Sequence, residues 1–510
     1  MVQHPVSALT VGDLMSSPAV TCAENTSLGE AAGLMQHHDI GSVVVVEEGK
    51  VAGILTERDL LRAAAGGSDP NTEPVRAWMT ANPDVLGPEE PAGTAWASLR
   101  HHRYRHLPVV EDGNLVGVVS MRNLMGAASL TAGDASLEAP RGLEGVIVAT
   151  TAVGDVRGHE GFYHYRQYSA VDLAASRQFE DVWHLLLFGE LPDLARRREF
   201  LDELHAHATL PESFRHVLAT VASAGSPLEV LRTGISLLGA HRALQPLSDI
   251  DQATARADAI GLGAAVPVLL ASTYRLARGL QVVEPRSDLP LAANYLWMLS
   301  GTEPDPEQAR ALDQYLIIAT DHGFNASTFT ARVISSTQAD LASAICGAIG
   351  ALSGPLHGGA PSRALDMLDA IGRVENAEAW LRSAVASDQR LMGFGHRIYR
   401  TEDPRAAFLR TVAQRLGGPL VDLAVEVEQV ALRVLDELKP GRELHTNLEF
   451  YAGVVMDRCG IPRDLFTPTF AVARTVGWTV HVLEQMADNR LFRPSARYVG
   501  PPPPQPVPDL

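Results

Sequence analysis

The N-terminal part of the chain carries one pattern of apolar and polar positions twice. Matching positions lie 64 residues apart, as in Gly53 and Gly117 (117 − 53), so the two copies run in register. The matching pairs are Met15 and Met79, Gly49 and Gly113, Gly53 and Gly117, Thr56 and Ser120, and Asp59 and Asn123. Such self-similarity predicts two related folding units in tandem.

Within each copy, two apolar runs flank a glycine turn. The first copy has residues 42–47, then Glu48-Gly49-Lys50, then residues 51–56; the second has residues 107–111, then Asp112-Gly113-Asn114, then residues 115–120. Apolar runs separated by a glycine turn predict antiparallel hairpins. A helix is expected before each hairpin. Ser27-Leu28-Gly29-Glu30 can form a capping box, and the apolar faces would comprise Leu28, Ala31, Ala32, Leu34 and Met35 in the first copy and Ala95, Ala97 and Leu99 in the second.

Beyond the repeat the pattern changes. Residues 126–141 are rich in Ala, Gly and Ser and predict a linker. From Phe179 onward most segments have helical periodicity, and Gly189 is expected to end one of these helices. The C-terminal part should therefore be mainly α-helical. Residues 501–510 begin with four prolines in succession and predict an extended tail.

Composition narrows the classes of function. The 510 residues are 46% hydrophobic and 20% charged, which supports a large folded core. A formal net charge of −18 argues against sequence-independent nucleic-acid binding, although a local arginine cluster could hold a small anion. The three cysteines, Cys22, Cys346 and Cys459, indicate neither a disulfide framework nor a zinc site.

The chain shows no sign of export. Its start, Met1-Val2-Gln3-His4-Pro5, lacks a basic segment followed by an apolar one, and apolar runs such as Ala264–Ala271 are shorter than the ~20 residues that span a bilayer. We therefore expect a cytoplasmic protein with no membrane partner.

Three motifs in the C-terminal part combine histidine or glutamate with glycine. They are Gly354-Pro355-Leu356-His357-Gly358-Gly359-Ala360, Met392-Gly393-Phe394-Gly395-His396-Arg397-Ile398-Tyr399 and Asn447-Leu448-Glu449-Phe450-Tyr451-Ala452-Gly453. Imidazole donates or accepts a proton near neutral pH, and a carboxylate can act as a base. This set suits proton transfer at a carbonyl group and at the carbon beside it. Taken singly, any of these residues could instead be structural.

Together, the three motifs resemble the citrate synthase family, and the resemblance runs from about Gly142 to Gly500. Further matching stretches are Gly142-Leu143-Glu144-Gly145-Val146, Tyr165-Arg166-Gln167-Tyr168, Asp172-Leu173, Asp321–Phe329, Ala473–Trp478 and Arg493-Pro494. The resemblance implies a mainly α-helical fold with a large and a small domain over residues 142–500. It also implies condensation of acetyl-CoA with oxaloacetate and water to give citrate and CoA, with no permanently bound cofactor and no metal.

The resemblance also implies roles for individual residues. His357 would hydrogen-bond the thioester oxygen, Glu449 would remove the methyl proton, and His396 would polarise and protonate the oxaloacetate carbonyl. His322, Arg405, Arg474 and Arg493 would bind oxaloacetate, with Arg493 supplied by a neighbouring subunit in a homodimer or higher homo-oligomer. Gly393, Phe394 and Gly395 would lie against coenzyme A. Apart from the resemblance, Arg397 and Arg400 are expected to form a solvated basic rim, with contact to coenzyme phosphates as the alternative.

Glu449 departs from the family pattern, which has aspartate at this position. The extra methylene moves the carboxylate by roughly 1 Å, and a misplacement of that size can cost ~10²-fold in rate. Smaller departures are Pro361-Ser362 and Gly323. Two alternatives therefore stay open: a 2-methylcitrate synthase that uses propionyl-CoA, and a catalytically impaired homologue that senses a ligand.

The N-terminal repeat resembles a tandem pair of cystathionine-β-synthase-type (CBS) domains, an α/β module, over residues 8–125, with copies at 8–66 and 72–125. The resemblance implies an adenosine nucleotide, AMP or ATP, bound by Thr56 and Asp59, with a weaker second site at Ser120 and Asn123 because Asn123 lacks the charge. Allosteric control of the condensing enzyme would follow. In the alternative interpretation, Asp59 only caps a helix and the pair only dimerises.

Overall fold

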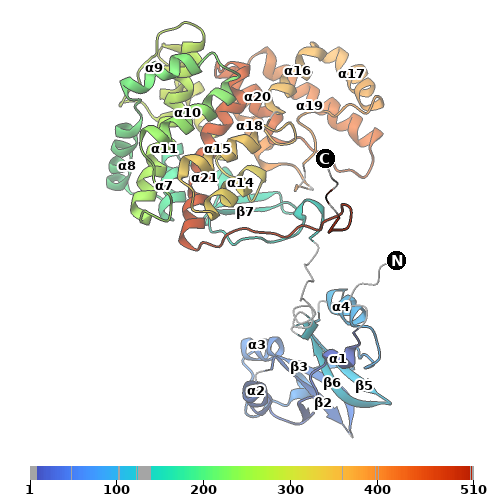
Figure 1. Cartoon of the computed structure of the whole chain (residues 1–510). Coiled ribbons are helices and arrows are strands. Elements are labelled where there is room, and N and C mark those ends of the chain that lie inside the picture. The colour runs from blue at the N-terminus through green and yellow to red at the C-terminus, as the bar shows by residue number, and fades with distance from the viewer. Residues whose placement is uncertain are drawn as a thin grey trace. The chain divides into compact units, whose positions relative to one another are not determined.

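The computed structural model describes residues 9–38, 40–47, 49–101, 104–121, 123–124, 139–358, 360–396, 398–399, 401–505 and 507. The chain forms two compact units. One comprises Met1–Val146 with Arg497–Leu510, and the other comprises Ile147–Ala496 (Figure 1).

The N-terminal unit contains both predicted hairpins. Its elements are α1 (Val11–Leu14), β1 (Thr21–Ala23), α2 (Leu28–His37), β2 (Ser42–Glu47), β3 (Lys50–Thr56), α3 (Glu57–Ala65), a 3-10 turn at Val75–Ala77, β4 (Thr80–Ala81), α4 (Ala92–His101), β5 (His106–Glu111) and β6 (Asn114–Ser120). Strands β1-β2-β3-β4 form one sheet, in which β1 and β2 are parallel, and β5-β6 form a second. Both hairpins have a bulge at the equivalent place, Val45/Val46 and Val109/Val110, which confirms the internal repeat.

Each copy of the repeat completes the other. Met15 packs against Gly117, and Met79 packs against Gly53; a Cβ atom on either glycine would collide with the methionine. Accordingly, Val11 belongs to the apolar core of the second copy, while Val75 belongs to that of the first. The opening segment of each copy is therefore exchanged, and the two copies fold as one module.

The predicted helix signals hold with one exception. Ser27 and Glu30 form the expected capping box of α2, and Leu28, Ala31 and Met35 are buried. In α4, Ala95 and Leu99 are buried but Ala97 is exposed, so its assignment to the apolar face was wrong. The apolar face of this helix is narrower than the sequence pattern indicated, with Ala92 and Ala95 pointing inward.

The larger unit is mainly α-helical, as predicted, with one small antiparallel sheet that the sequence analysis did not predict. That sheet comprises β7 (Gly154–Arg157), β8 (Phe162–Tyr165) and β9 (Tyr168–Ser169), after a 3-10 turn at Arg141–Leu143 in the preceding unit. The helices are α6 (Ala170–Ser176), α7 (Phe179–Phe188), α8 (Leu194–His207), α9 (Glu212–Val221), α10 (Pro227–His241), α11 (Gln252–Ala277), α12 (Leu291–Ser300), α13 (Pro306–Ala319), α14 (Ala326–Ser336), α15 (Leu341–Leu352), α16 (Ala360–Ile371), α17 (Val374–Ala386), α18 (Pro404–Leu416), α19 (Pro419–Leu438), α20 (Leu448–Arg458), a 3-10 turn at Arg463–Leu465, and α21 (Phe466–Ala487). Gly189 ends α7 with a φ of 84°, as predicted for a C-terminal glycine.

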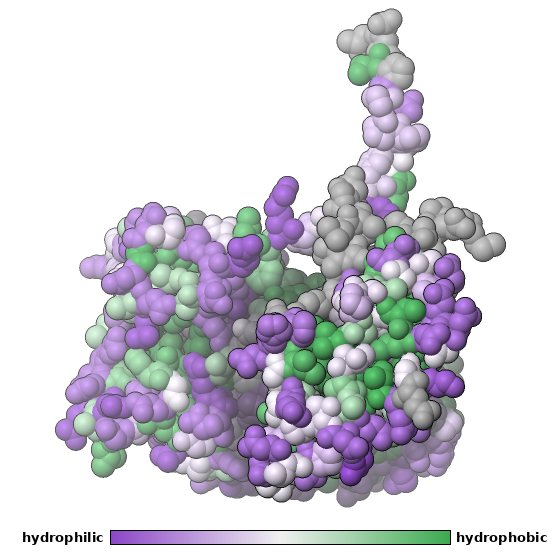
Figure 2. All heavy atoms as spheres, turned by 90° about the horizontal axis from the view of Figure 1, so that it is seen from below, coloured by the Kyte–Doolittle hydropathy of each residue, from purple (hydrophilic) through white to green (hydrophobic). Residues whose placement is uncertain are grey.

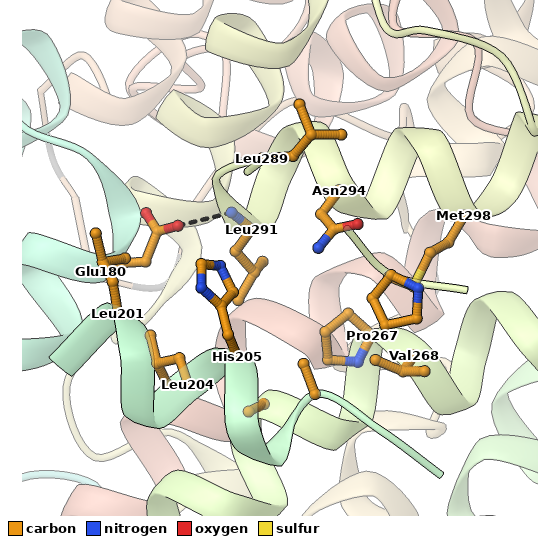
Figure 3. Close-up of a pocket in the computed structure, with 13 residues that line it drawn as sticks. Glu180, Leu201, Leu204, His205, Pro267, Val268, Leu289, Leu291, Asn294 and Met298 are labelled. Atoms are coloured by element: carbon orange, nitrogen blue, oxygen red, sulfur yellow. Dashed lines mark hydrogen bonds between the residues drawn. The ribbon is translucent and has the colours of Figure 1, made fainter. Parts of the chain in front are cut away.

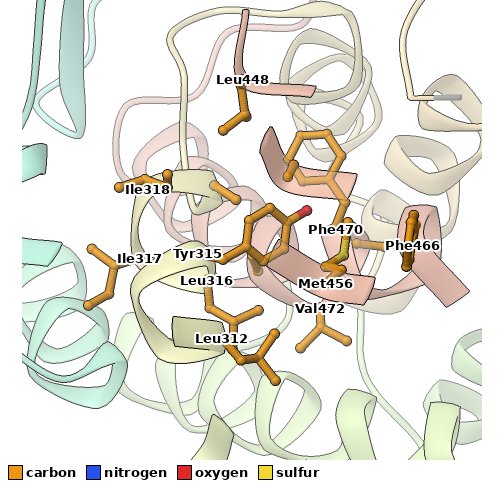
Figure 4. Close-up of a cluster of buried hydrophobic side chains, with 14 of the residues drawn as sticks. Leu312, Tyr315, Leu316, Ile317, Ile318, Leu448, Met456, Phe466, Phe470 and Val472 are labelled. Carbon is orange, nitrogen blue, oxygen red and sulfur yellow. The ribbon is translucent and has the colours of Figure 1, made fainter. Parts of the chain in front are cut away.

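Within this unit, α14, α15, α18, α20 and α21 lie between a group formed by α7–α11 and a group formed by α16, α17 and α19 (Figure 1). A core of aromatic and aliphatic side chains joins α13, α20 and α21. Figure 4 shows Tyr315 of α13 beside Phe466 and Phe470 of α21 and Met456 of α20. These packed helices form a rigid support for the loops between them.

One helix corrects the expectation that apolar segments are too short to span a bilayer. Among the described residues, α11 alone is long and apolar enough to cross a membrane, but 83% of its most apolar window is buried inside the protein. Its apolar residues pack against α21 and α8, as in a core helix. Figure 2 shows hydrophilic residues interspersed with smaller hydrophobic areas on the displayed face.

Candidate active site

The glycine-rich loop before His396 is fixed to the start of α20. Gly395 N donates to His445 O (2.7 Å), Asn447 N donates to Gly393 O (2.9 Å), and Asn447 Nδ2 donates to Gly395 O (2.9 Å). Gly393 and Gly395 have φ values of 89° and 83°, which favour glycine. Phe394 is buried against Phe450, so its side chain anchors the loop. The motifs that contain His396 and Glu449 are thereby held side by side.

His396 is arranged as a neutral hydrogen-bond donor. Its Nδ1 atom accepts hydrogen bonds from the backbone N–H groups of Ile398 and Tyr399, both at 3.1 Å. The proton of the neutral ring must then be on Nε2. Burial, together with the charge of Arg405, lowers the pKa of His396 to about 4, so the ring is neutral at neutral pH.

Arg405 faces the same point as His396. Its Nη2 atom lies 3.2 Å from His396 Nε2, while Nε and Nη2 also donate to Asp403 at 3.0 and 2.8 Å. Asp403 also accepts a hydrogen bond from Leu448 N at the start of α20 (3.1 Å). Both Arg405 and Asp403 are buried. With the His396 proton on Nε2, the two groups place N–H donors side by side, which suits an acceptor such as a carboxylate or carbonyl oxygen.

His357 is also arranged as a hydrogen-bond donor, but through Nδ1, whereas His396 donates through Nε2. The backbone N–H of Ser327 donates to His357 Nε2 (3.3 Å), and the Ser327 hydroxyl lies 2.8 Å from the same atom. The hydrogen bond from the backbone N–H therefore assigns the ring proton to Nδ1. Trp478 Nε1 donates to Ser327 Oγ (3.2 Å), which fixes the hydroxyl. Burial, and secondarily Arg474, lowers the pKa of His357 to about 4.

Glu449 occupies the first turn of α20, and Asn447 caps the helix by accepting from Glu449 N (3.0 Å). Burial raises the pKa of the Glu449 carboxyl from its ordinary 4.5 to about 7, although Arg405 and Arg390 act in the opposite direction. A carboxylate that titrates near neutral pH is suited to act as a general base.

Arg474 on α21 is a buried cation that lacks full hydrogen bonding. It is 4% exposed, and its Nε and Nη1 atoms have no partner among the described residues. Burial lowers its pKa. Buried unpaired guanidinium donors are costly unless they meet an anion, so Arg474 stays a candidate for binding a carboxylate.

His322 lies among the other predicted residues. Its ring centroid is 5.4 Å from that of His396, and its Nε2 atom is 3.0 Å from the Tyr399 hydroxyl. The structure thus brings together His322, His396 and Arg405, and the charge of Arg474 acts on both His322 and His357. Arg493, by contrast, is exposed on the segment after α21. Arg397 and Arg400 lie outside the described residues.

The predicted nucleotide-binding residues form helix caps in this structure. Thr56 N and Thr56 Oγ1 donate to Asp59 Oδ2 (2.8 and 2.7 Å), and Arg62 pairs with Asp59 Oδ1. Ser120 and Asn123 repeat the arrangement, with Ser120 N donating to Asn123 Oδ1 at 2.9 Å. The structure therefore shows the capping role, which was the alternative to nucleotide binding. Nucleotide binding itself stays a prediction.

Sequence reasoning missed several residues that organise the site. They are Ser327, Tyr399, Asp403, Asn447 and Trp478. Asp403 had a local signal, because an aspartate before Pro404 is typical of a helix N-terminus. The others are recognised only by their partners in space.

A cavity lies apart from these residues, between α7, α8, α11 and α12 (Figure 3). It is mainly apolar, and Glu180 at its edge accepts a hydrogen bond from Leu291 N (2.6 Å). None of the predicted site residues lines it. Among the described residues, no group of three or more His, Cys, Asp or Glu side chains is arranged to hold a metal ion.

Comparison with known proteins shows the family. A family model described as citrate synthase, C-terminal domain, matches residues 142–495, and a CBS domain model matches residues 11–66 and 75–130. The citrate synthase of Acidithiobacillus ferridurans is 39% identical over 369 residues, which are 70% of this chain and 95% of that protein. Citrate synthase 2 of Bacillus subtilis is 40% identical over 371 residues, 72% of this chain and 97% of its own.

Solved structures give the same result. The citrate synthase of Pyrobaculum aerophilum matches with a TM-score of 0.67 at 37% identity, covering 73% of this chain and 96% of that one. A ternary complex of the Thermoplasma acidophilum citrate synthase with carboxymethyl coenzyme A and oxaloacetate matches with a TM-score of 0.68 at 28% identity, covering 73% and 99%.

Proposed function

The chain belongs to the citrate synthase family and is an enzyme of that type, and from this premise we propose that it condenses acetyl-CoA with oxaloacetate and water to give citrate and free CoA in the cytoplasm. One observation carries the proposal. His396 Nε2 and Arg405 Nη2 lie 3.2 Å apart, beside a loop that is hydrogen-bonded to the helix bearing Glu449. This arrangement provides a base and oxyanion-type donors in a single site.

The first chemical step is enolisation of acetyl-CoA. The Glu449 carboxylate takes a proton from the methyl carbon, and His357 Nδ1–H donates to the thioester oxygen as negative charge develops there. A neutral imidazole suits this role because it stabilises the charge without first giving up a proton. The Ser327 backbone N–H supports it by holding Nε2 as an acceptor.

The second step is carbon–carbon bond formation. The methylene carbon attacks the ketone carbon of oxaloacetate, and His396 Nε2–H gives its proton to the oxygen that becomes the citrate hydroxyl. Water then hydrolyses the thioester of the citryl-CoA intermediate and releases CoA as a free thiol. Arg405, Arg474 and His322 hold the two carboxylates of oxaloacetate during this sequence.

Arg493 completes the site from a second subunit of a homodimer. Its exposure on the segment after α21 in the single chain supports this assignment, because an exposed guanidinium group is free to reach the site of a neighbouring subunit. The complex of the Thermoplasma relative with oxaloacetate and carboxymethyl coenzyme A supports the choice of substrates.

Release of free thiol from acetyl-CoA, with and without oxaloacetate, tests the proposal. We expect release that depends on oxaloacetate, and the same assay with propionyl-CoA ranks the two acyl groups. Absence of release with either acyl-CoA would contradict the proposal. Glu449→Asp then decides between a wrong assignment and an impaired homologue, because restored activity would identify the extra methylene as the cause.

We further propose that the CBS pair binds an adenosine nucleotide, AMP or ATP, through Thr56 and Asp59 and thereby changes the activity. The match of residues 11–66 and 75–130 to the CBS domain model supports this, and ribose hydroxyls would have to share the Asp59 carboxylate with Thr56 and Arg62. A regulator must bind the active and inactive arrangements with different affinities.

Asp59→Asn is the matched test, because Asn123 already occupies the equivalent position in the second copy and keeps its cap. We expect Asp59→Asn to preserve folding and to weaken AMP or ATP binding in calorimetry at least about tenfold, through loss of one charged acceptor. Unchanged nucleotide affinity in Asp59→Asn, or no binding to the wild type, would leave Asp59 with its capping role alone.

A further inference from the structure

We propose that Tyr399 is a positioning residue that holds His322 with its proton on Nδ1, so that His322 donates a hydrogen bond to an oxygen of oxaloacetate. The inference rests on the proposed function, which supplies oxaloacetate as the ligand. It adds to that function a residue that does not itself carry out proton transfer and that determines how the ketoacid is held.

Tyr399 contacts three members of the site through three different groups. Its hydroxyl lies 3.0 Å from His322 Nε2, and its backbone N–H donates to His396 Nδ1 at 3.1 Å. Its ring lies 4.8 Å from the His396 ring and 5.6 Å from the guanidinium carbon of Arg405. Tyr399 is 2% exposed, so these contacts are enclosed by the protein.

The charges around His322 determine the protonation state of the His322–Tyr399 pair. Arg405 and Arg474 act on His322, and the neutral rings of His396 and Tyr163 pack against it. Burial and these two guanidinium groups lower the pKa of His322 far below 6.5, while burial raises the pKa of Tyr399. At neutral pH the pair is therefore a neutral imidazole and a neutral phenol, which share one hydrogen bond.

A neutral imidazole has one N–H group. The ring nitrogen that faces the ligand must carry it. Oxaloacetate has only acceptor oxygens, so a ring that binds it must present N–H. Because Nε2 already faces Tyr399, the ligand-binding nitrogen is Nδ1, and Nε2 must accept from the phenol. The Tyr399 hydroxyl thus selects the tautomer of His322 without adding charge to the site.

The neighbouring phenol does not provide this contact. Tyr163 packs 5.6 Å from the His322 ring, but its hydroxyl donates to the backbone oxygen of Ile318 (3.3 Å). Within the described part of the chain, Tyr399 is the side chain whose hydroxyl meets His322 Nε2. The role can therefore be removed by deleting one oxygen atom while the ring and the backbone contact to His396 stay in place.

The test compares Tyr399→Phe with Tyr295→Phe in the full-length protein. Tyr295 is a matched control because it is fully buried and its hydroxyl pairs with Thr469 Oγ1 (2.9 Å) away from the site. For Tyr399→Phe we expect KM for oxaloacetate to rise about 5- to 20-fold, with KM for acetyl-CoA within about twofold of the wild type. Tyr295→Phe should change neither KM, although it can lower thermal stability.

Two outcomes would overturn the inference: an unchanged KM for oxaloacetate in Tyr399→Phe, or equal changes in both KM values. A readout independent of activity is nuclear magnetic resonance of the protein labelled with ¹⁵N-histidine, with the His322 signals assigned by their loss in His322→Gln. We expect a protonated Nδ1 in the wild type and mixed tautomers in Tyr399→Phe, whereas a protonated Nε2 in the wild type would refute the proposal. If the wild type releases no thiol, the proposed function fails, and the ¹⁵N spectra still decide the tautomer.

Discussion

His396 Nε2 and Arg405 Nη2 lie 3.2 Å apart, and both atoms are hydrogen-bond donors. The backbone N–H groups of Ile398 and Tyr399 donate to His396 Nδ1. His396 Nε2 could accept from Arg405 only if the ring proton moved to Nδ1, which would break both of those hydrogen bonds. An acceptor oxygen to one side of the pair can receive a hydrogen bond from each group. The close approach of two donors therefore favours an anionic oxygen ligand.

Arg474 provides a test that separates stability from binding. In Arg474→Met we expect oxaloacetate affinity to fall at least about 100-fold, because a substrate carboxylate loses its buried guanidinium partner. The melting temperature without ligand should stay the same or rise, because the substitution removes a buried cation whose Nε and Nη1 atoms have no partner among the described residues. Calorimetry with oxaloacetate and thermal unfolding measure the two effects.

Arg332 is the matched control for Arg474. It is equally buried, but it pairs with Glu484 (2.7 Å) and with Gln485 (2.9 Å). Arg332→Met should destabilise the fold by about 3 kcal/mol, because it leaves Glu484 without its buried partner. A large loss of stability in Arg474→Met, similar to that in Arg332→Met, would show that Arg474 is a structural residue.

Glu449 should control the pH dependence of the reaction. The base must be deprotonated, so kcat/KM for acetyl-CoA should rise with pH through an apparent pKa near 7. Glu449→Gln should lower kcat about 10²- to 10⁴-fold. Initial rates between about pH 5.5 and 8.5 measure the profile, and a rate that does not change across neutral pH would exclude Glu449 as the base.

The same titration predicts a change in stability. The folded state raises the pKa of Glu449 from 4.5 to about 7, so the folded protein binds this proton more tightly than the unfolded chain does. The resulting stabilisation is fully present below pH 4.5 and is lost as pH rises through about 7. Glu449→Gln should therefore be more stable than the wild type at alkaline pH, which thermal unfolding at several pH values would reveal.

Gly393 should tolerate no side chain. Its φ is 89°, and a Cβ atom would lie 2.8 Å from Phe450 Cβ. Gly393→Ala should destabilise the protein by roughly 2–4 kcal/mol and lower activity, because the loop before His396 must move. Gly279→Ala is the control, since Gly279 has a φ of 67° with open space around it and should cost only about 1 kcal/mol. Equal losses for the two variants, measured by thermal unfolding, would exclude the contact with Phe450 as the cause.

Ser327 should orient His357. Ser327→Ala removes the hydroxyl at 2.8 Å from Nε2 but keeps the backbone N–H, so the Nδ1–H tautomer is retained. We expect kcat to fall about tenfold, and thermal unfolding should also show a loss of stability because the hydroxyl bonds Trp478 Nε1 and Asn325 Oδ1 as well. Thr330→Ala on the same helix removes a hydroxyl bonded only to Ala326 O and should leave kcat unchanged. A full-rate Ser327→Ala enzyme would show that the backbone contact alone fixes the ring.

The sequence alone determined the repeat, both hairpins and the helical character of the larger unit. These features depend on local periodicity and turn chemistry, which neighbouring residues encode. Gly189 and the Ser27 capping box were predictable for the same reason. The short sheet at 154–169 was missed, because its strands of two to four residues are too short to show a period.

Only the tertiary structure decided which nitrogen of each histidine is a donor. His357 Nε2 and His396 Nδ1 are fixed by backbone N–H groups of Ser327, Ile398 and Tyr399, and the first of these is 30 residues away from the histidine that it holds. The raised pKa of Glu449 and the unpaired N–H groups of Arg474 likewise come from burial by helices distant in sequence. The sequence names the groups capable of the chemistry, but protonation state and direction depend on desolvation and on partners that meet only in the folded chain.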